Sequence, residues 1–227
     1  MRRVLRTLST VLILSGVLLL ADAGLTVAWQ EPVSALYAQV TQDRLGGDLD
    51  ELEAAPLPAL EQRALDRLPD TRRRTAFLAR SLKRRLDEGD AAGRVRIPKI
   101  GVDYVIVDGT KPNSLRKGPG LFPENPWPGA KGTTAIAGHR TTYAAPFRTV
   151  DDLRRGDDVI VQMPYGRFTY EVERTRIVKP DALWVLNQVS YDRLVLSACH
   201  PLYSAAERII VFARLVKSEP RGRALDA

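Results

Sequence analysis

The residues best suited to covalent chemistry in this sequence are its single cysteine and its two histidines. Cys199 lies in the stretch LSACHP with His200 directly after it, and His139 lies far upstream in AGHR. A cysteine thiolate is a strong nucleophile, and a nearby imidazole can move the protons that its reactions need. This combination is typical of nucleophilic catalysis, and the question is which histidine would serve the cysteine.

The predicted strand YDRLVLSAC argues against His200. Successive side chains of a strand point to opposite faces, so Cys199 and His200 would point apart. Pro201 is unsuited to a central strand, so we expect the strand to end near Cys199 and His200 to be a rim residue. His139 follows the apolar strand TTAIAG and opens the polar loop HRTTYAAPF. We therefore predict that His139 is the partner of Cys199, although a lone cysteine usually packs as a small hydrophobic residue.

Arg208 is a third candidate, because it opens the predicted strand ERIIVFARLV. An antiparallel hairpin through the loop PLYSAAE would return Arg208 to a position beside Cys199. Attack of a thiolate on a carbonyl creates an oxyanion, which the fixed donors of a guanidinium can stabilise. Without the cysteine and histidine, the default interpretation would be a solvated arginine at the start of a strand.

The composition argues against several other classes of site. One cysteine excludes an intramolecular disulfide framework and a cysteine-rich zinc site. The histidines show no metal-ligand spacing, so we expect neither a metal nor another cofactor. The net charge of +7 suits a surface that faces anionic lipid or wall polymer. Scattered basic residues without interleaved aromatics argue against nucleic acid as a partner.

The N-terminus predicts a membrane anchor at residues 1–29. Basic residues in the tail 1–7 precede a largely apolar run at residues 8–29, and a bilayer core requires roughly 20 such residues. Positive charge before the run places the N-terminus in the cytoplasm and the rest of the chain outside. The alternative is a cleaved signal peptide with its cleavage site at residues 21–23. The retained anchor is favoured because the apolar character resumes after Ala23 and continues to Trp29.

The remaining chain divides into three segments of different composition. Residues 30–93 are polar and helix-prone, and they predict an extracellular stalk that acts as a spacer. Residues 94–217 predict one all-β domain, closed or sandwiched, because short β-rich runs alternate with turn signals. These runs are VRIPKIGVDYVIVDG, TTAIAGH, DDVIVQM, RFTYEVERTRIV, YDRLVLSAC and ERIIVFARLV. Residues 218–227 are expected to form a flexible tail.

Together these motifs resemble the sortase family, the membrane-anchored cysteine transpeptidases of Gram-positive bacteria. His139 in AGHR, Cys199 in LSACHP and Arg208 in ERIIVFARL follow the order of that family, and IPKIGV and GPG are similar to it as well. The resemblance spans about residues 94–217. The run HRTTYAAPF, the short loop from Cys199 to Arg208 and CHP are most like the class E sortases of actinobacteria. One departure is VLSAC in place of the common TLxTC, so that Ala198 lacks a hydroxyl, which puts the substrate preference in question.

The resemblance implies a closed eight-stranded β-barrel with short helices and a two-step reaction without a cofactor. Cys199 would attack the Thr–Gly bond of an LPxTG-like sorting signal, or LAxTG in class E, to form a thioacyl enzyme. His139 would act as general acid and base, and Arg208 would hold the oxyanion and the substrate backbone. Tyr143 and Ala198 are candidate substrate-binding residues.

The implied partners are surface proteins with a C-terminal sorting signal, the amine of a peptidoglycan precursor and the cytoplasmic membrane. The alternative is a catalytically silent module of the same fold that binds sorting-signal peptides or scaffolds the cell envelope.

Overall fold

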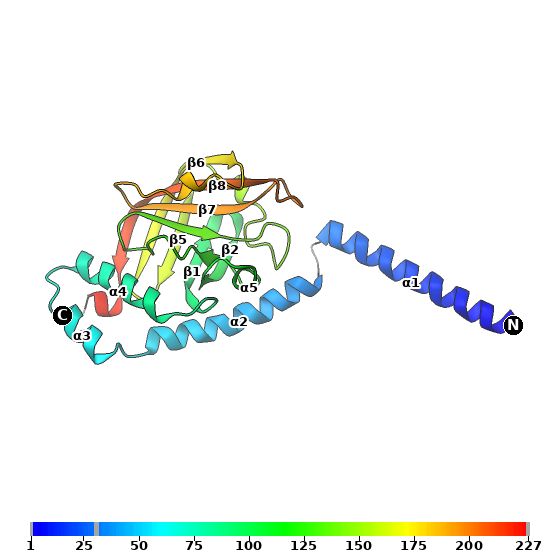
Figure 1. Cartoon of the computed structure of the whole chain (residues 1–227), viewed down its shortest axis with the longest axis horizontal. Helices are drawn as coiled ribbons and strands as arrows, with labels where there is room; N and C mark the ends of the chain where they lie inside the picture. Colours follow the sequence, from blue (N-terminus) through cyan, green and yellow to red (C-terminus); the bar gives the residue numbers. More distant parts are fainter. Residues whose placement is uncertain (1, 30–31, 226–227) are drawn as a thin grey trace.

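The computed structural model describes residues 2–29 and 32–225. Within these residues, eight strands close into a barrel with the spatial order β1-β2-β3-β4-β7-β8-β6-β5 (Figure 1). The predicted fold class is therefore confirmed. The strands are β1 (Ala91–Ile97), β2 (Val102–Asp108), β3 (Gly120–Leu121), β4 (Thr133–Ala137), β5 (Asp158–Met163), β6 (Gly166–Val178), β7 (Arg193–His200) and β8 (Glu207–Pro220).

The barrel forms because its strands alternate between inward apolar and outward polar side chains. In β5, for example, Val159, Val161 and Met163 are buried while the residues between them are more exposed. Closure leaves each of the strands paired on both sides, which removes the exposed edges of an open sheet. Most neighbours are antiparallel, but β2 with β3 and β4 with β7 run parallel. The parallel β4–β7 pair matters for the site, because it carries two distant segments in the same direction.

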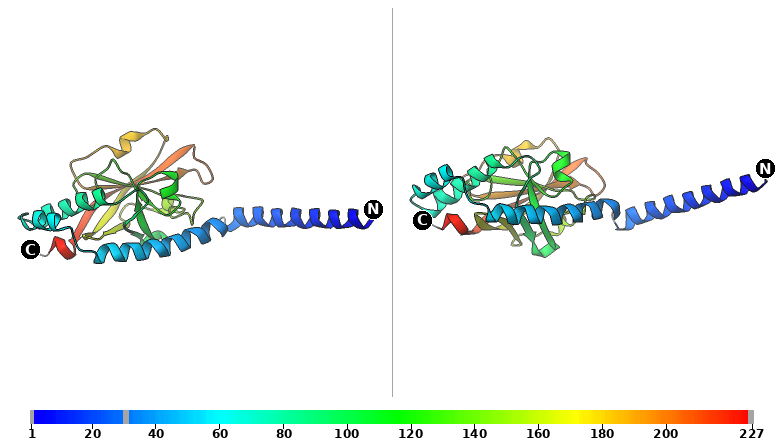
Figure 2. Two further views of the ribbon diagram at one scale, coloured as in Figure 1. Left: turned by 60° about the horizontal axis from the view of Figure 1, so that its bottom comes forward. Right: turned by 90° about the horizontal axis from the view of Figure 1, so that it is seen from below.

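The segment between the N-terminal helix and the barrel forms helices α2 (Pro32–Ala54), α3 (Ala59–Asp66) and α4 (Thr71–Arg85). These helices were expected, but they lie along the barrel instead of extending from it as a spacer (Figures 1 and 2). Leu65, Leu78 and Leu82 are buried in the main hydrophobic core. Leu45 and Leu49 of α2 pack against β1 and β2. Burial of these leucines outweighs the polar character of the other helix faces.

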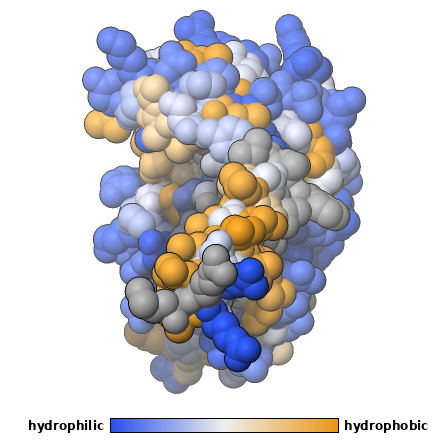
Figure 3. Space-filling model, turned by 90° about the vertical axis from the view of Figure 1, so that its right-hand side faces the viewer, coloured by the Kyte–Doolittle hydropathy of each residue, from blue (hydrophilic) through white to orange (hydrophobic). Residues whose placement is uncertain are grey.

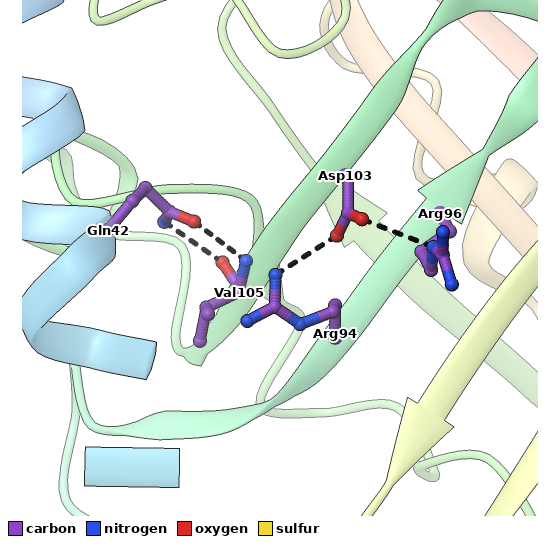
Figure 4. A network of polar contacts seen from close by, with 5 residues as sticks. All are labelled: Gln42, Arg94, Arg96, Asp103 and Val105. Carbon is purple, nitrogen blue, oxygen red and sulfur yellow. Dashed lines mark hydrogen bonds and ion pairs between the residues drawn. The ribbon is translucent and has the colours of Figure 1, made fainter. Parts of the chain in front are cut away.

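Gln42 on α2 contacts the barrel much as a neighbouring strand would (Figure 4). Its Oε1 accepts a hydrogen bond from the Val105 amide at 2.7 Å, and its Nε2 donates to the Val105 carbonyl at 3.1 Å. The same Nε2 donates to the Lys117 carbonyl at 2.8 Å. Strand β3 pairs with β2 only at Val107 and Asp108, so Gln42 satisfies backbone groups that β3 does not reach.

Helix α1 (Arg2–Trp29) projects away from the barrel, and Figure 3 views its hydrophobic surface from that end. Its segment Arg3–Gly24 is long and apolar enough to cross a membrane, a criterion that a signal sequence also meets. The part of the prediction that falls on residues 1 and 30–31 lies outside the described residues.

The expected flexible tail is not observed over residues 218–225. Strand β8 continues to Pro220, and the short helix η4 (Gly222–Ala224) follows, with Ala224 fully buried. The backbone of Glu219 and Pro220 pairs with the start of β6. Residues 226–227 lie outside the described residues. The other short helices are η1 (Pro98–Ile100), α5 (Pro112–Leu115), η2 (Val150–Asp152) and η3 (Leu183–Leu186).

Candidate active site

The strand register brings the three predicted site residues together. Strands β7 and β8 are antiparallel, and Cys199 lies directly opposite Arg208, as the hairpin predicted. Strands β4 and β7 are parallel, and their pairing ends at Ala137 and Ser197. His139 lies two residues after Ala137, and Cys199 lies two residues after Ser197. The parallel pairing thus joins a histidine and a cysteine that are far apart in sequence.

These three residues line one groove with a volume of about 330 Å³. Cys199 is partly exposed, so its thiol can be reached from solvent. One wall of the groove is apolar and comes from the end of β6, helix η3 and β8, with Val178, Leu183, Val185, Leu186 and Ile210. The site is therefore an open groove that has one apolar wall and is lined by the nucleophile, a shape that suits an extended peptide.

His139 has one ring nitrogen that is free for chemistry. Its Nε2 is buried and has no hydrogen-bond partner among the described residues, whereas its Nδ1 lies 3.4 Å from the Thr142 hydroxyl. Burial lowers the pKa of His139 below its ordinary value of 6.5, and the positive charge of Arg116 lowers it further. The imidazole is therefore neutral at pH 7 and can accept a proton there.

The loop after His139 holds an unusual backbone. Tyr143, Ala144 and Ala145 are consecutive residues with positive φ angles of 52°, 57° and 42°. A residue other than glycine in the left-handed region costs roughly 1–2 kcal/mol. Such a conformation persists only where surrounding contacts determine it, and it is frequent near functional sites.

Contacts from α2 and β2 supply that constraint. The Ser34 hydroxyl accepts a hydrogen bond from the Tyr143 amide at 3.4 Å, and the Tyr104 hydroxyl donates to the Ala144 carbonyl at 3.2 Å. Tyr37 meets Tyr143 edge to face, with ring centroids 6.4 Å apart. The ring of Tyr143 also contacts the ring of His139, with the two centroids 5.1 Å apart. The first turns of α2 therefore support the loop that carries His139.

Arg208 is anchored at the turn between β7 and β8. Its Nη1 donates to the carbonyls of Ala205 and Glu207, both at 2.9 Å. No other hydrogen bond from the Arg208 guanidinium is present among residues 2–29 and 32–225. One arm of the fork is thus fixed while its remaining donors stay available to an oxyanion or a substrate carbonyl.

The other sequence candidates occupy different places. His200 is the last residue of β7 and does not line the groove, in agreement with its prediction as a rim residue. Ala198 is buried and lines the groove. Its contact with substrate stays a prediction. Tyr143 is not among the groove-lining residues; it packs against His139, and its proposed contact with substrate likewise stays a prediction.

Sequence reasoning missed the groove wall and the residue that supports it. The buried Arg193 stabilises helix η3, because its Nη2 donates to the carbonyls of Val185 at 3.1 Å and Asn187 at 2.7 Å. An arginine at the start of an apolar strand was the available signal, but nothing local showed which carbonyls it would meet. Within the described part of the chain, no group of three or more His, Cys, Asp or Glu side chains could hold a metal ion.

Comparison with known proteins gives consistent matches. The family profile described as the Sortase domain matches residues 95–216. Sortase D of Bacillus subtilis (strain 168) is 34% identical over 134 residues, which cover 57% of this chain and 66% of that protein. A Sortase D5 transpeptidase of Clostridium perfringens has a TM-score of 0.55 at 26% identity, covering 65% of this chain and 99% of that chain. Sortase E1 of Streptomyces coelicolor, solved with a tripeptide in its active site, has a TM-score of 0.55 at 26% identity, covering 59% of this chain and 92% of that chain.

The chain spans 44% to 66% of the length of the curated relatives it matches. The matched segment contains His139, Cys199 and Arg208, and it covers the closed barrel except for the start of β1 and the end of β8. Sequence profile, barrel topology and the related solved structures agree on the family. The chain belongs to the sortase family.

Proposed function

We propose that this protein is a cysteine transpeptidase that cleaves the Thr–Gly bond of a sorting signal and joins the new end to an amine. The observation that carries the proposal is the common groove of Cys199, His139 and Arg208, in which His139 Nε2 is buried without a partner. A free imidazole nitrogen beside a reachable thiol is what acyl transfer requires.

In the first step, the Cys199 sulfur attacks the threonine carbonyl carbon and its proton passes to His139 Nε2. The tetrahedral oxyanion collapses, the C–N bond breaks, and His139 gives the proton to the leaving glycine amine. A thioester between Cys199 and threonine remains. The lowered pKa of His139 supports this sequence, because the neutral imidazole accepts the proton first.

In the second step, an amine attacks the thioester and His139 removes the proton that the amine loses. The C–S bond breaks, the thiolate regains the proton from His139, and a new amide is released. Arg208 stabilises the oxyanion in both steps, since it lies opposite Cys199 and has donors to spare. A fixed donor at this position is worth on the order of 10²–10³ in kcat.

The substrate we propose is an LPxTG-like or LAxTG-like signal at the end of a surface protein. The apolar groove wall favours a peptide that carries apolar residues, such as the leucine and the proline or alanine of the signal, on the N-terminal side of the threonine. Within the family we propose class E, on the motifs HRTTYAAPF and CHP and on the likeness to Sortase E1 of Streptomyces coelicolor. Sortase D of Bacillus subtilis is also similar to this chain, so the preference for one of the two peptides is the measurement that decides between the classes.

The acceptor we propose is the amine of a peptidoglycan precursor, and the site of action is the outer face of the cytoplasmic membrane. Helix α1 supports this placement, because it has the length and composition of a single membrane span and basic residues at its start.

The test uses the full chain in detergent micelles with quenched LPxTG and LAxTG peptides and hydroxylamine as acceptor. Mass spectrometry should find cleavage after threonine and a threonine hydroxamate. Cys199→Ala should abolish the product, and His139→Ala and Arg208→Ala should lower kcat at least about 100-fold. Arg155→Ala, an exposed arginine in a turn, is the matched control and should leave kcat unchanged. Binding without turnover would favour the silent module, and cleavage by Cys199→Ala would refute the mechanism.

A further inference from the structure

Arg140, the residue after the proposed general base His139, is buried although burial of its positive charge is unfavourable. Its side chain is only 2% exposed. Arginine is almost never this buried unless its guanidinium is paired. Here the guanidinium has three partners: two lie in the segment 148–151 and the third is His200 at the end of β7.

The contacts of Arg140 converge on the active-site end of the barrel. Its Nε donates to the Arg148 carbonyl at 3.1 Å, and its Nη2 pairs with the Asp151 carboxylate at 2.5 Å. Its Nη1 lies 2.9 Å from Nδ1 of His200, the residue after Cys199. The two residues that follow the proposed catalytic pair are therefore bound to each other.

This contact is the link that continues the β4–β7 pairing. The ladder ends at Ala137 and Ser197, and Gly138 donates one further backbone bond to the Ser197 carbonyl at 3.0 Å. Beyond that point, no backbone hydrogen bond joins residues 139–141 to residues 198–202 in the described structure. The Arg140–His200 contact spans the gap at the level of His139 and Cys199.

The contact also defines the state of His200. A guanidinium has donors only, so Nδ1 of His200 must be the acceptor. The ring proton of a neutral His200 then resides on Nε2. His200 consequently acts as an acceptor for Arg140 and is not available at Nδ1 for proton transfer.

We propose that Arg140 is a positioning residue, which sets the spacing of His139 and Cys199 by binding His200 across the end of the β4–β7 pair. The roles of His139 and Cys199 in this statement rest on the proposed function. The Asp151 carboxylate and the Arg148 carbonyl hold the guanidinium in the orientation that this contact needs. Lysine at position 140 would keep the charge but lose the planar fork that binds in three directions.

Kinetics of Arg140→Lys and His200→Leu give the first readout, at a temperature where circular dichroism shows each variant folded. We expect kcat to fall about 10- to 100-fold with KM within about twofold, because small displacements of catalytic groups cost up to about 10²-fold in rate. His200→Asn, which retains an acceptor for Arg140, should recover most of the rate. The matched control is Arg96→Lys, because Arg96 is an exposed arginine of β1 that pairs with Asp103 of β2. A kcat of Arg140→Lys within twofold of the native value would overturn the proposal.

Two readouts do not depend on turnover. The bifunctional reagent 1,3-dibromoacetone should bridge Cys199 and His139 by two alkylations that release two bromide ions, as mass spectrometry would show. Arg140→Lys and His200→Leu should give mainly the singly attached cysteine adduct, whereas Arg96→Lys should crosslink like the native protein. If native protein crosslinks but turns over no peptide, the proposed function fails and the positioning role stands.

The second turnover-independent readout is nitrogen NMR of the imidazole rings. The chain has two histidines, so their signals can be assigned with one variant. Native His200 should carry its proton on Nε2 and none on Nδ1, and this fixed state should be lost in Arg140→Lys. A native His200 with its proton on Nδ1 would exclude the contact and with it the positioning role.

Discussion

The protonation state of His139 illustrates how single residues define this site. Burial removes solvent from the imidazolium, and Arg116 adds a like charge, so both lower the pKa of His139. Arg116 also lies over the ring of Tyr143, at 5.8 Å from its centroid. The positive charge is thus held beside the same loop that carries the histidine. A neutral imidazole at pH 7 is consistent with its proposed first role as proton acceptor.

Arg116→Gln should therefore raise the pKa of His139. The pKa should stay below 6.5, because burial, the larger of the two causes, remains. The folded state disfavours the imidazolium, so His139 contributes stability above pH 6.5 that is lost as the pH falls through the lowered pKa. Proton NMR titration of the two histidines measures the change, with His200 as the internal reference. An unchanged or lower pKa of His139 would contradict the assigned role of Arg116.

At the scale of elements, α2 is part of the structural support of the active site. Its first turns contact the loop after His139 through Ser34 and Tyr37, and Gln42 satisfies the backbone of Val105 further along. The left-handed residues of that loop need such external constraint, because their backbone conformation is intrinsically unfavourable. Helix α2, which follows the apolar helix α1, therefore contacts Tyr143 and through it His139, the proposed general acid and base.

Gln42→Ala should lower the free energy of unfolding by about 2 kcal/mol, because it leaves the buried amide and carbonyl of Val105 unpaired. Gln62→Ala is the matched control: the hydrogen bond from Gln62 to Asp66 on α3 is exposed, and its loss should cost less than about 0.5 kcal/mol. Denaturation by urea, followed by tryptophan fluorescence, compares the two variants. Equal effects of the two substitutions would mean that Gln42 does not serve as a substitute strand partner.

At the scale of the whole molecule, the apolar helix α1 lies at one end of the barrel. Helix α1 projects from one end of the barrel, and α2 continues in roughly the same direction along the barrel (Figure 2). With α1 as the proposed membrane anchor, this arrangement would hold the domain close to the bilayer, because only residues 30–31 separate α1 from α2. We therefore expect the packing of α2 on the barrel, and not a long spacer, to set the distance between the groove and the bilayer.

The single cysteine offers a direct test of this orientation. A membrane-impermeant maleimide should label Cys199 in intact cells that express the full chain, because the thiol is partly exposed and predicted to lie outside. In the double variant Val4→Cys, Cys199→Ser, labelling should occur only after permeabilisation. Labelling of Cys199 only in permeabilised cells would reverse the topology. Release of a shortened protein that lacks residue 4 would identify a cleaved signal peptide.

The sequence by itself determined the features that depend on neighbouring residues. Alternating apolar residues predicted the strands, and the short loop between Cys199 and Arg208 allowed little besides the hairpin that pairs them. His139 could be assigned to the end of a strand for the same local reason. Local periodicity therefore predicted an all-β domain and placed His139, Cys199 and Arg208 at the ends of strands, whereas the closed eight-stranded barrel was implied by the resemblance to the family.

Only the tertiary structure decided the contacts between distant segments. The pairing of β4 with β7 brings His139 to Cys199, and it also buries Arg140, whose charge suggests exposure when read alone. Helix α2 carries leucines among many charged residues, so the sequence favoured a solvated spacer, whereas the barrel offers those leucines an apolar surface. Periodicity tells which face of an element is apolar, but the surface that covers that face is set by the rest of the fold.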